Sequence, residues 1–214
     1  MSGITLSSKA RRLSSASTAV VWSLVVVWFF AVILLANDQF FVASPGRPPL
    51  TLLAAATAPV LLFLFGVSLS PAVREFALTV DLKFATAVQA WRLGAYTFLI
   101  LYSYGYLPGY FAWPAAIGDM FVGATAPLLL RRIDQAAFRQ GKIFFLWNVF
   151  GILDLIIAVA LGALGSLLAD NAGGISPTTI MSQLPLVLVP TFFLPMFLVL
   201  HLIAILQAMQ QRHI

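Results

Sequence analysis

The chain has 214 residues, of which 61% are apolar and only 9% are charged, whereas soluble domains carry about 25% charged residues. Runs of about 20 apolar residues recur along it, and this pattern excludes an ordinary soluble domain and predicts membrane-spanning helices. The sequence contains no cysteine, which excludes disulfides, iron–sulfur clusters and thiolate metal sites formed by this chain.

The first two predicted spans follow a polar, basic segment at residues 1–17. A cleaved signal peptide also begins with basic residues, but its apolar core is only about 7–15 residues long. The first apolar run, at 18–36, is longer, so we predict a retained helix and keep the cleaved signal as the alternative. The second span is predicted at 51–69. Residues 72–82, which mix charged and apolar side chains, are typical of a short interfacial helix.

Four further apolar runs follow, separated by polar or Gly- and Pro-rich segments. Each is long enough to cross a bilayer as a helix. The sequence therefore predicts an all-α, polytopic integral membrane bundle of six transmembrane helices, with one transmembrane domain at 18–209. These four spans are 83–104, 110–130, 143–168 and 183–209, and a short tail follows at 210–214.

The distribution of basic residues predicts the orientation. Six spans place both termini on the same side, and cytoplasmic segments carry an excess of Lys and Arg. If both termini are cytoplasmic, ten of the twelve basic residues lie on the cytoplasmic side, Arg47 alone lies outside, and Arg92 lies within the membrane. We therefore expect a multi-pass inner-membrane protein with both termini in the cytoplasm. The net charge of +5 is then a topology signal, and no nucleic-acid partner is expected. The remaining basic residues are Lys9, Arg11, Arg12, Arg74, Lys83, Arg131, Arg132, Arg139, Lys142 and Arg212.

A few polar residues interrupt the last four spans. A charged side chain at bilayer depth costs about 2.5–3.5 kcal/mol on insertion scales, so such residues are candidates for function. At about 1.5 Å per residue, Asp119 and Asp154 each lie about 18 Å from the nearest basic end of their helix, near the midplane. The predicted substrate or proton site comprises Arg92, Asp119, Asp154 and His201, with Gln89 and Asn148 as supporting polar residues.

The two aspartates each continue along a helix face of small residues, which lets helices pack closely in lipid. We expect one aspartate to be neutralised by Arg92, so the other needs a different counter-charge, a metal or a proton. A metal site would require Asp119, Asp154 and His201 to converge; two carboxylates and an imidazole suit zinc, manganese or iron. Whether a metal binds stays open, and no cofactor is expected.

Three functions are compatible with these residues. The first is a proton-coupled carrier or permease for a small molecule or ion, with Arg92, Asp119 and Asp154 at its site. The second is a structural or accessory subunit, alone as an oligomer or with a partner, whose buried ion pair locks the helices. The third is a membrane enzyme acting on a lipid-like substrate, although no catalytic residue is assigned because the sequence has no nucleophile or nucleotide motif.

Three stretches, LPGYFAWPAAIGDMFVGATAP, LWNVFGILDL and LPLVLVPTFFLPMFLVLHL, resemble segments of small uncharacterised bacterial multi-pass inner-membrane proteins. The resemblance covers the C-terminal half of the chain. It implies a membrane helix bundle and points to Asp119, Asn148, Asp154 and His201, but it implies no substrate and no mechanism.

Overall fold

The computed structural model of the protein describes residues 15–43, 47–172 and 176–210. These residues form helices joined by turns, and no β-strand occurs among them. The all-α prediction is therefore confirmed. The predicted basic segment with Lys9, Arg11 and Arg12, and the tail with Arg212, lie outside the described residues.

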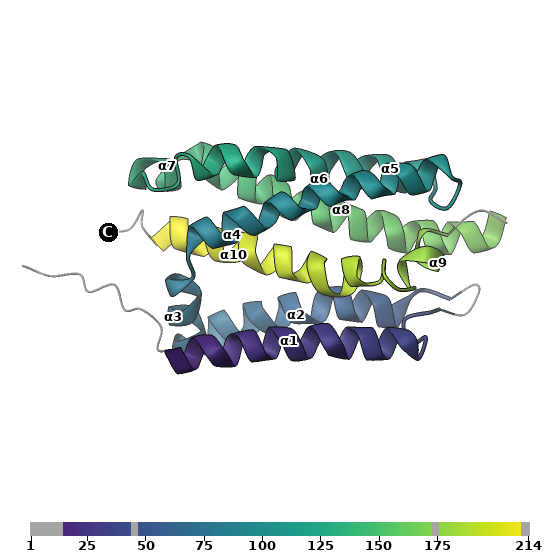
Figure 1. Cartoon of the computed structure of the whole chain (residues 1–214), viewed down its shortest axis with the longest axis horizontal. Helices are drawn as coiled ribbons and strands as arrows, with labels where there is room; N and C mark the ends of the chain where they lie inside the picture. The colour runs from purple at the N-terminus through teal and green to yellow at the C-terminus, as the bar shows by residue number, and fades with distance from the viewer. Residues whose placement is uncertain (1–14, 44–46, 173–175, 211–214) are drawn as a thin grey trace, which may run out of the picture.

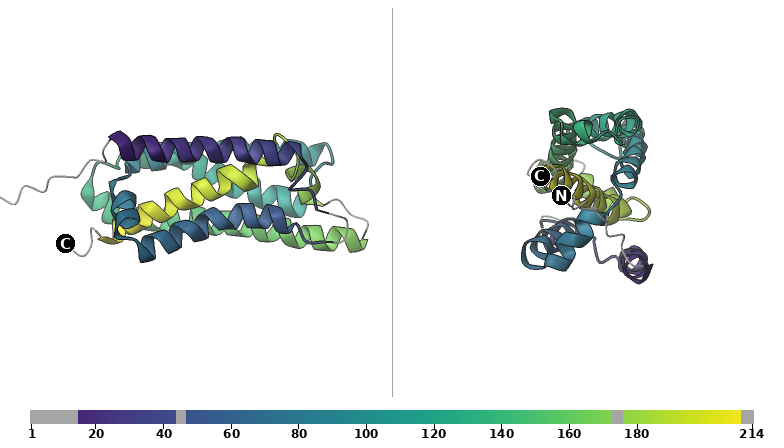
Figure 2. Two further views of the ribbon diagram at one scale, coloured as in Figure 1. Left: turned by 90° about the horizontal axis from the view of Figure 1, so that it is seen from below. Right: turned by 90° about the vertical axis from the view of Figure 1, so that its left-hand side faces the viewer.

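Most of the helices run along the long axis of the molecule (Figure 1). Viewed from the end, α10 lies between the group formed by α4, α5, α6 and α8 and the pair formed by α1 and α2 (Figure 2). The α-helices are α1 (Ser15–Asn37), α2 (Leu50–Leu69), α3 (Pro71–Thr79), α4 (Leu82–Val88), α5 (Tyr96–Ser103), α6 (Gly109–Leu130), α7 (Ala136–Gln140), α8 (Lys142–Ala172), α9 (Pro177–Met181) and α10 (Leu194–Gln210). The 3₁₀-helix η1 spans Gln89–Ala95 and the π-helix η2 spans Val189–Phe193.

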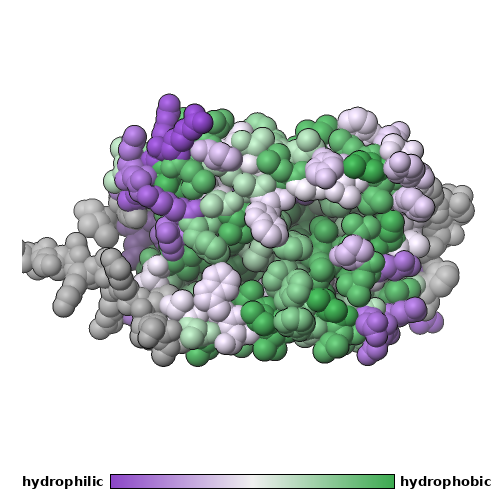
Figure 3. Space-filling view, in the orientation of Figure 1, coloured by the Kyte–Doolittle hydropathy of each residue, from purple (hydrophilic) through white to green (hydrophobic). Residues whose placement is uncertain are grey.

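Five helices in the described part of the chain are long and apolar enough to cross a membrane. Apolar side chains cover the middle of the face in Figure 3, and hydrophilic ones gather toward its ends. An apolar band of this kind is what a bilayer requires of the surface it contacts. The five segments are Thr18–Asn37, Leu50–Leu69, Gly109–Leu130, Lys142–Leu167 and Val189–Gln210.

The predicted third span is not a single α-helix. Its residues form α4, η1 and α5 in direct succession. In a 3₁₀-helix, residues three apart lie directly above one another, and the buried residues of η1 are Gln89, Arg92 and Ala95. The 3₁₀ winding thus keeps Arg92 on one straight buried stripe. Gly123 of α6 allows the close approach, since a Cβ there would lie 2.6 Å from the backbone nitrogen of Leu93.

The predicted sixth span begins later than expected. Residues before Val189 form turns and α9, and the apolar segment Val189–Gln210 consists of η2 followed by α10. Proline lacks the N–H that an α-helix needs at every interior position. Pro190 is the second residue of the π-helical turn, and Pro195 follows the turn at the start of α10. The π-winding at this place has that local cause. It sets the Thr191 hydroxyl to donate to the carbonyl of Val187 at 2.6 Å.

The segment between the second and third spans contains α3, a helix of nine residues. Pro71 occupies the first turn, where its missing N–H is not needed, and the Ser70 hydroxyl accepts a hydrogen bond from the Val73 N–H at 3.4 Å. The start of α1, α3, α7 and the end of α10 lie at the same end of the bundle (Figure 1). This end carries Arg74, Lys83, Arg131 and Arg139.

Candidate functional site

Arg92 of η1 is the centre of a buried polar cluster and is only 2% exposed. Its Nε donates to Asp119 Oδ1 at 2.5 Å, and its Nη2 donates to Asp154 Oδ2 at 2.5 Å. Its Nη1 donates to the carbonyl of Gly151 at 3.3 Å and lies 3.0 Å from His201 Nε2. The guanidinium therefore has a partner for most of its five N–H groups, and each partner comes from α6, α8 or α10.

The structure brings Arg92, Asp119, Asp154 and His201 into one cluster, although they come from four segments of the chain. Both carboxylates bind the same guanidinium, each through a different nitrogen. The sequence predicts that only one acid binds the arginine; the structure differs in the hydrogen bonds, although one guanidinium still balances the charge of only one acid. The fork of the guanidinium explains the difference, because its donors diverge in one plane and can serve two acceptors at once.

The hydrogen bonds of His201 define its tautomer. Every nitrogen of a guanidinium is a donor only, so Nε2, 3.0 Å from Arg92 Nη1, must accept. The proton then sits on Nδ1, which lies 2.9 Å from Asn148 Oδ1. Asn148 Nδ2 in turn donates to the carbonyl of Phe144 at 2.8 Å. His201 is thus neutral in this arrangement, and Asn148 holds its orientation.

Two glycines, Gly118 of α6 and Gly151 of α8, make room for the cluster. A Cβ at Gly118 would overlap with the Asp154 carboxylate, and a Cβ at Gly151 would overlap with the imidazole of His201. Gly151 also accepts a hydrogen bond from Arg92 through its carbonyl. Both glycines allow an approach that any larger residue would prevent.

Gln89 and Asn148, the two predicted supporting residues, have different roles. Asn148 is part of the cluster through His201. Gln89 lies one turn from Arg92 but bonds outside the cluster, its Nε2 donating to the carbonyl of Phe197 at 3.3 Å. Its Oε1 is buried and has no partner within the described residues. Gln89 therefore connects η1 to α10 and leaves one acceptor unused.

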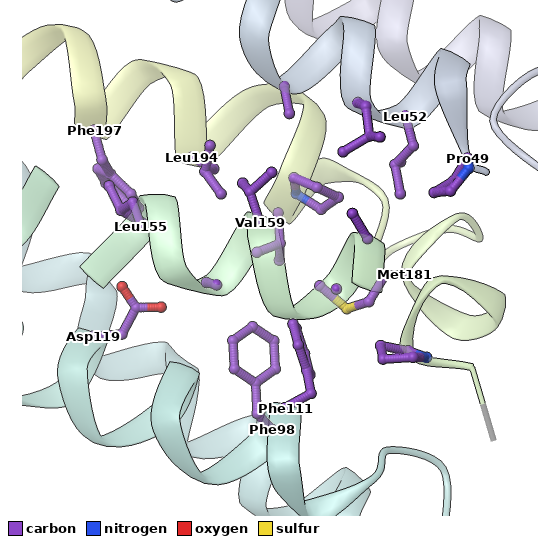
Figure 4. Close-up of a pocket in the computed structure, with 18 residues that line it drawn as sticks. Pro49, Leu52, Phe98, Phe111, Asp119, Leu155, Val159, Met181, Leu194 and Phe197 are labelled. Atoms are coloured by element: carbon purple, nitrogen blue, oxygen red, sulfur yellow. The ribbon is translucent and has the colours of Figure 1, made fainter. Parts of the chain in front are cut away.

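The two aspartates differ in what their second oxygen meets. Asp154 Oδ1 packs against Gly118. Asp119, by contrast, lines a cavity of about 80 Å³ between α2, α6, α8 and α10, and in Figure 4 one of its oxygens points toward the other lining residues. Only Asp119 Oδ1 accepts from Arg92, and within the described residues Oδ2 has no hydrogen-bond partner. Asp119 is therefore the acid that borders this cavity.

The geometry of these residues is not that of a metal site. Asp119, Asp154 and His201 surround the guanidinium of Arg92, which lies where a shared ion would have to sit. In the part of the chain that the structure describes, no group of three or more His, Asp or Glu side chains is placed to hold a metal ion. What the arrangement offers is a carboxylate beside a fixed cation.

Sequence reasoning missed the roles of Gly118 and Gly151 and a contact that supports the cluster from the side. Trp147 Nε1 donates to the Thr125 hydroxyl at 2.8 Å, and its ring meets the His201 ring edge-on at 5.3 Å. A signal for the glycines exists, since Gly118 precedes Asp119 directly and Gly151 lies one helical turn before Asp154. No sequence signal shows which helix each glycine faces.

The chain was compared with protein families, curated proteins and solved structures. No curated protein and no solved structure matches it. Residues 49–209 match a family described as a domain of unknown function, DUF8737. The matched region begins after α1 and includes every residue of the Arg92 cluster. Because the match covers most of the chain, the protein belongs to the DUF8737 family.

Proposed function

We propose that the protein is a six-pass inner-membrane carrier in which the cluster of Arg92, Asp119 and Asp154 exchanges a proton for a solute. In addition to the five long helices, the third span along the chain also crosses the membrane. It is formed by α4, η1 and α5, whose 22 residues follow one another without a break. At rises of about 1.5 Å for α and 2.0 Å for 3₁₀ residues, this rod is long enough for a hydrocarbon core of about 30 Å. The end with the basic side chains faces the cytoplasm by the positive-inside rule.

One observation supports the carrier most directly, namely that Asp119 binds Arg92 through Oδ1 and also lines a cavity. With Arg92 charged and His201 neutral, two ionised carboxylates leave the cluster one negative charge in excess. A buried excess charge is costly, so a proton or a bound cation offsets it. Asp119 is the residue that exchanges them, while Asp154 keeps Arg92 in place.

The carrier is tested in proteoliposomes with a pH-sensitive dye inside and a panel of organic amines, organic cations and carboxylates outside. A transported solute is expected to change the internal pH in wild-type vesicles and not in Asp119→Asn vesicles. Asp38→Asn, which removes an exposed acid far from the cluster, is the matched control. The carrier is wrong if every pH change in the panel persists in Asp119→Asn.

The alternative is a structural subunit, favoured by the number of partners that hold Arg92. In this case the cluster serves only to lock η1 to α6, α8 and α10. The structural alternative predicts that Arg92→Ala greatly lowers the stability of the protein and that Asp119→Asn leaves its proton binding unchanged. The carrier predicts that proton binding by the folded protein falls by about one proton per chain when Asp119 is replaced, because that oxygen is the exchange site.

A further inference from the structure

A second cavity meets Asp119 from the side of the bundle. This groove, of about 200 Å³, lies between η1 and α5 on one side and η2 and the start of α10 on the other. The face in Figure 3 is hollowed in its middle, over this part of the bundle. Each edge contains a segment of non-α winding; mid-helix 3₁₀ stretches often mark hinges, and π-helical turns are often found at functional sites. The exposed ring of Trp91 stands at the mouth, and Arg92 and Asp119 form the floor.

The groove and the inner cavity adjoin one another. They share four lining residues, Phe98, Asp119, Val189 and Phe197. Both phenylalanines are buried, and each lines both spaces. Side chains alone therefore separate a solute in the groove from the inner cavity. Asp119 lines both spaces, so its carboxylate is close to the solute in either one.

The chemistry of this space selects for charge. Its walls are mainly apolar. Asp119 is the charged residue that lines both spaces, and Arg92 lies beside it in the groove. The cluster to which both residues belong carries one excess negative charge. An anion would be repelled, and a neutral apolar solute would gain nothing from Asp119. A quaternary ammonium group gains both the carboxylate and the aromatic faces of Phe98, Phe111 and Phe197, since cations are attracted to ring faces.

We propose that the groove between η1 and η2 admits a lipophilic organic monocation from the bilayer, and that the cation binds against Asp119 in place of a proton. The inference rests on the proposed carrier function and names its class of solute. The O–H bond of protonated Asp119 breaks, the proton leaves to water, and the cation supplies the positive charge that the proton had supplied. The net charge of the site is therefore the same before and after the exchange.

The test uses two probes of the same shape, benzyltrimethylammonium and its neutral counterpart neopentylbenzene. Binding is measured by calorimetry with the full chain in lipid nanodiscs, and empty nanodiscs are the blank. We expect only the cation to bind saturably and to release about one proton per chain in weakly buffered solution. Measurements on the wild-type protein are sufficient to overturn the proposal: they do so if neopentylbenzene binds equally well, or if the cation binds without proton release.

Variants then locate the site. Asp119→Asn is expected to weaken cation binding more than tenfold, whereas Asp38→Asn leaves it unchanged. At Gly94, a Cβ would meet nothing within 4 Å, so Gly94→Trp fits the fold and fills the groove. We expect it to slow cation association about tenfold, with Gly94→Ala as the control. Cation binding that is unaffected by both Asp119→Asn and Gly94→Trp places the cation elsewhere and refutes the route.

The outcomes separate this inference from the carrier itself. If another solute drives proton movement through Asp119 while benzyltrimethylammonium does not bind, the carrier stands and the cation class is wrong. If the cation binds and displaces a proton but no solute moves protons across the vesicle membrane, the site stands and the carrier is wrong.

Discussion

Gly151 on α8 lies directly against the imidazole of His201 on α10, so closely that a Cβ at position 151 would sit 2.5 Å from Cε1. The same residue accepts a hydrogen bond from Arg92. One glycine thus fixes the distance between α8 and α10 where the polar cluster is built.

The first prediction follows from that contact. Gly151→Ala is expected to displace His201 and to destabilise the protein by about 1–3 kcal/mol, as overpacking of a tight core does. Gly162→Ala on the same helix is the control, because its Cβ would lie 3.5 Å from Phe111, an ordinary contact. Alanine favours helix by up to about 1 kcal/mol over glycine, so Gly162→Ala should be neutral or stabilising. Thermal unfolding in detergent measures both, and equal stability of the two variants contradicts the prediction.

The second prediction concerns the charge of Arg92. Arg92→Ala leaves two carboxylates buried without a cation and is expected to cost about 3–5 kcal/mol. Arg92→Lys should also destabilise, because an ammonium cannot match the planar fork that binds both acids. Lys83→Ala is the control, since Lys83 pairs with Asp134 at the surface, where its side chain is 54% exposed. That change should leave the unfolding temperature unaltered.

Neutralising the acids should rescue the loss of Arg92. In Arg92→Leu combined with Asp119→Asn and Asp154→Asn, no buried charge remains, and we expect most of the stability of the wild-type protein to return. A triple variant as unstable as Arg92→Leu alone would show that the contacts of Arg92 matter for their geometry and not for their charge.

The third prediction concerns the tautomer of His201. Nitrogen-15 NMR of the selectively labelled protein should show a neutral imidazole with its proton on Nδ1, because Nε2 accepts from Arg92. Asn148→Ala removes the acceptor for that proton and is expected to cost about 1–3 kcal/mol, the penalty of an unsatisfied buried group. A proton on Nε2 in the wild-type protein would exclude the bond to Arg92.

The fourth prediction concerns the contact between Trp147 and Thr125, which joins α8 to α6 beside the cluster. Trp147→Phe and Thr125→Val each remove the hydrogen bond, and a double-mutant cycle of the two should give a coupling energy of about 0.5–1.5 kcal/mol. Additive effects of the two changes would mean that the hydrogen bond contributes nothing to stability.

The fifth prediction concerns the orientation in the membrane. Because the chain has no cysteine, a single introduced cysteine is the only thiol to react. Gln135→Cys, in the basic segment between α6 and α8, and Asp38→Cys, in the turn after α1, are exposed positions. We expect a membrane-impermeant maleimide to label Asp38→Cys in intact cells and Gln135→Cys only after the membrane is opened. The reverse pattern contradicts a cytoplasmic basic end.

The fold class and the residues that gather in the buried cluster could be predicted because both depend on properties of single segments. Apolar length marks a helix in lipid, and Arg92, Asp119 and Asp154 stand out because charge is costly there. The sharing of one guanidinium by two acids could not be predicted, since it depends on which faces of α6 and α8 meet. The same holds for the cavity beside Asp119, which is formed by residues from several helices.

The winding of η1 has a consequence for length and rotation. A 3₁₀-helix rises about 2.0 Å per residue against about 1.5 Å in an α-helix, so converting its seven residues would shorten the rod from α4 to α5 by about 3.5 Å. It would also turn Arg92 by about 60° relative to Gln89, because three α-helical residues fall short of a full turn. Such a rotation would draw the guanidinium away from Asp119 and Asp154. The two ion pairs of Arg92 therefore depend on the 3₁₀ winding of η1, a segment of only seven residues.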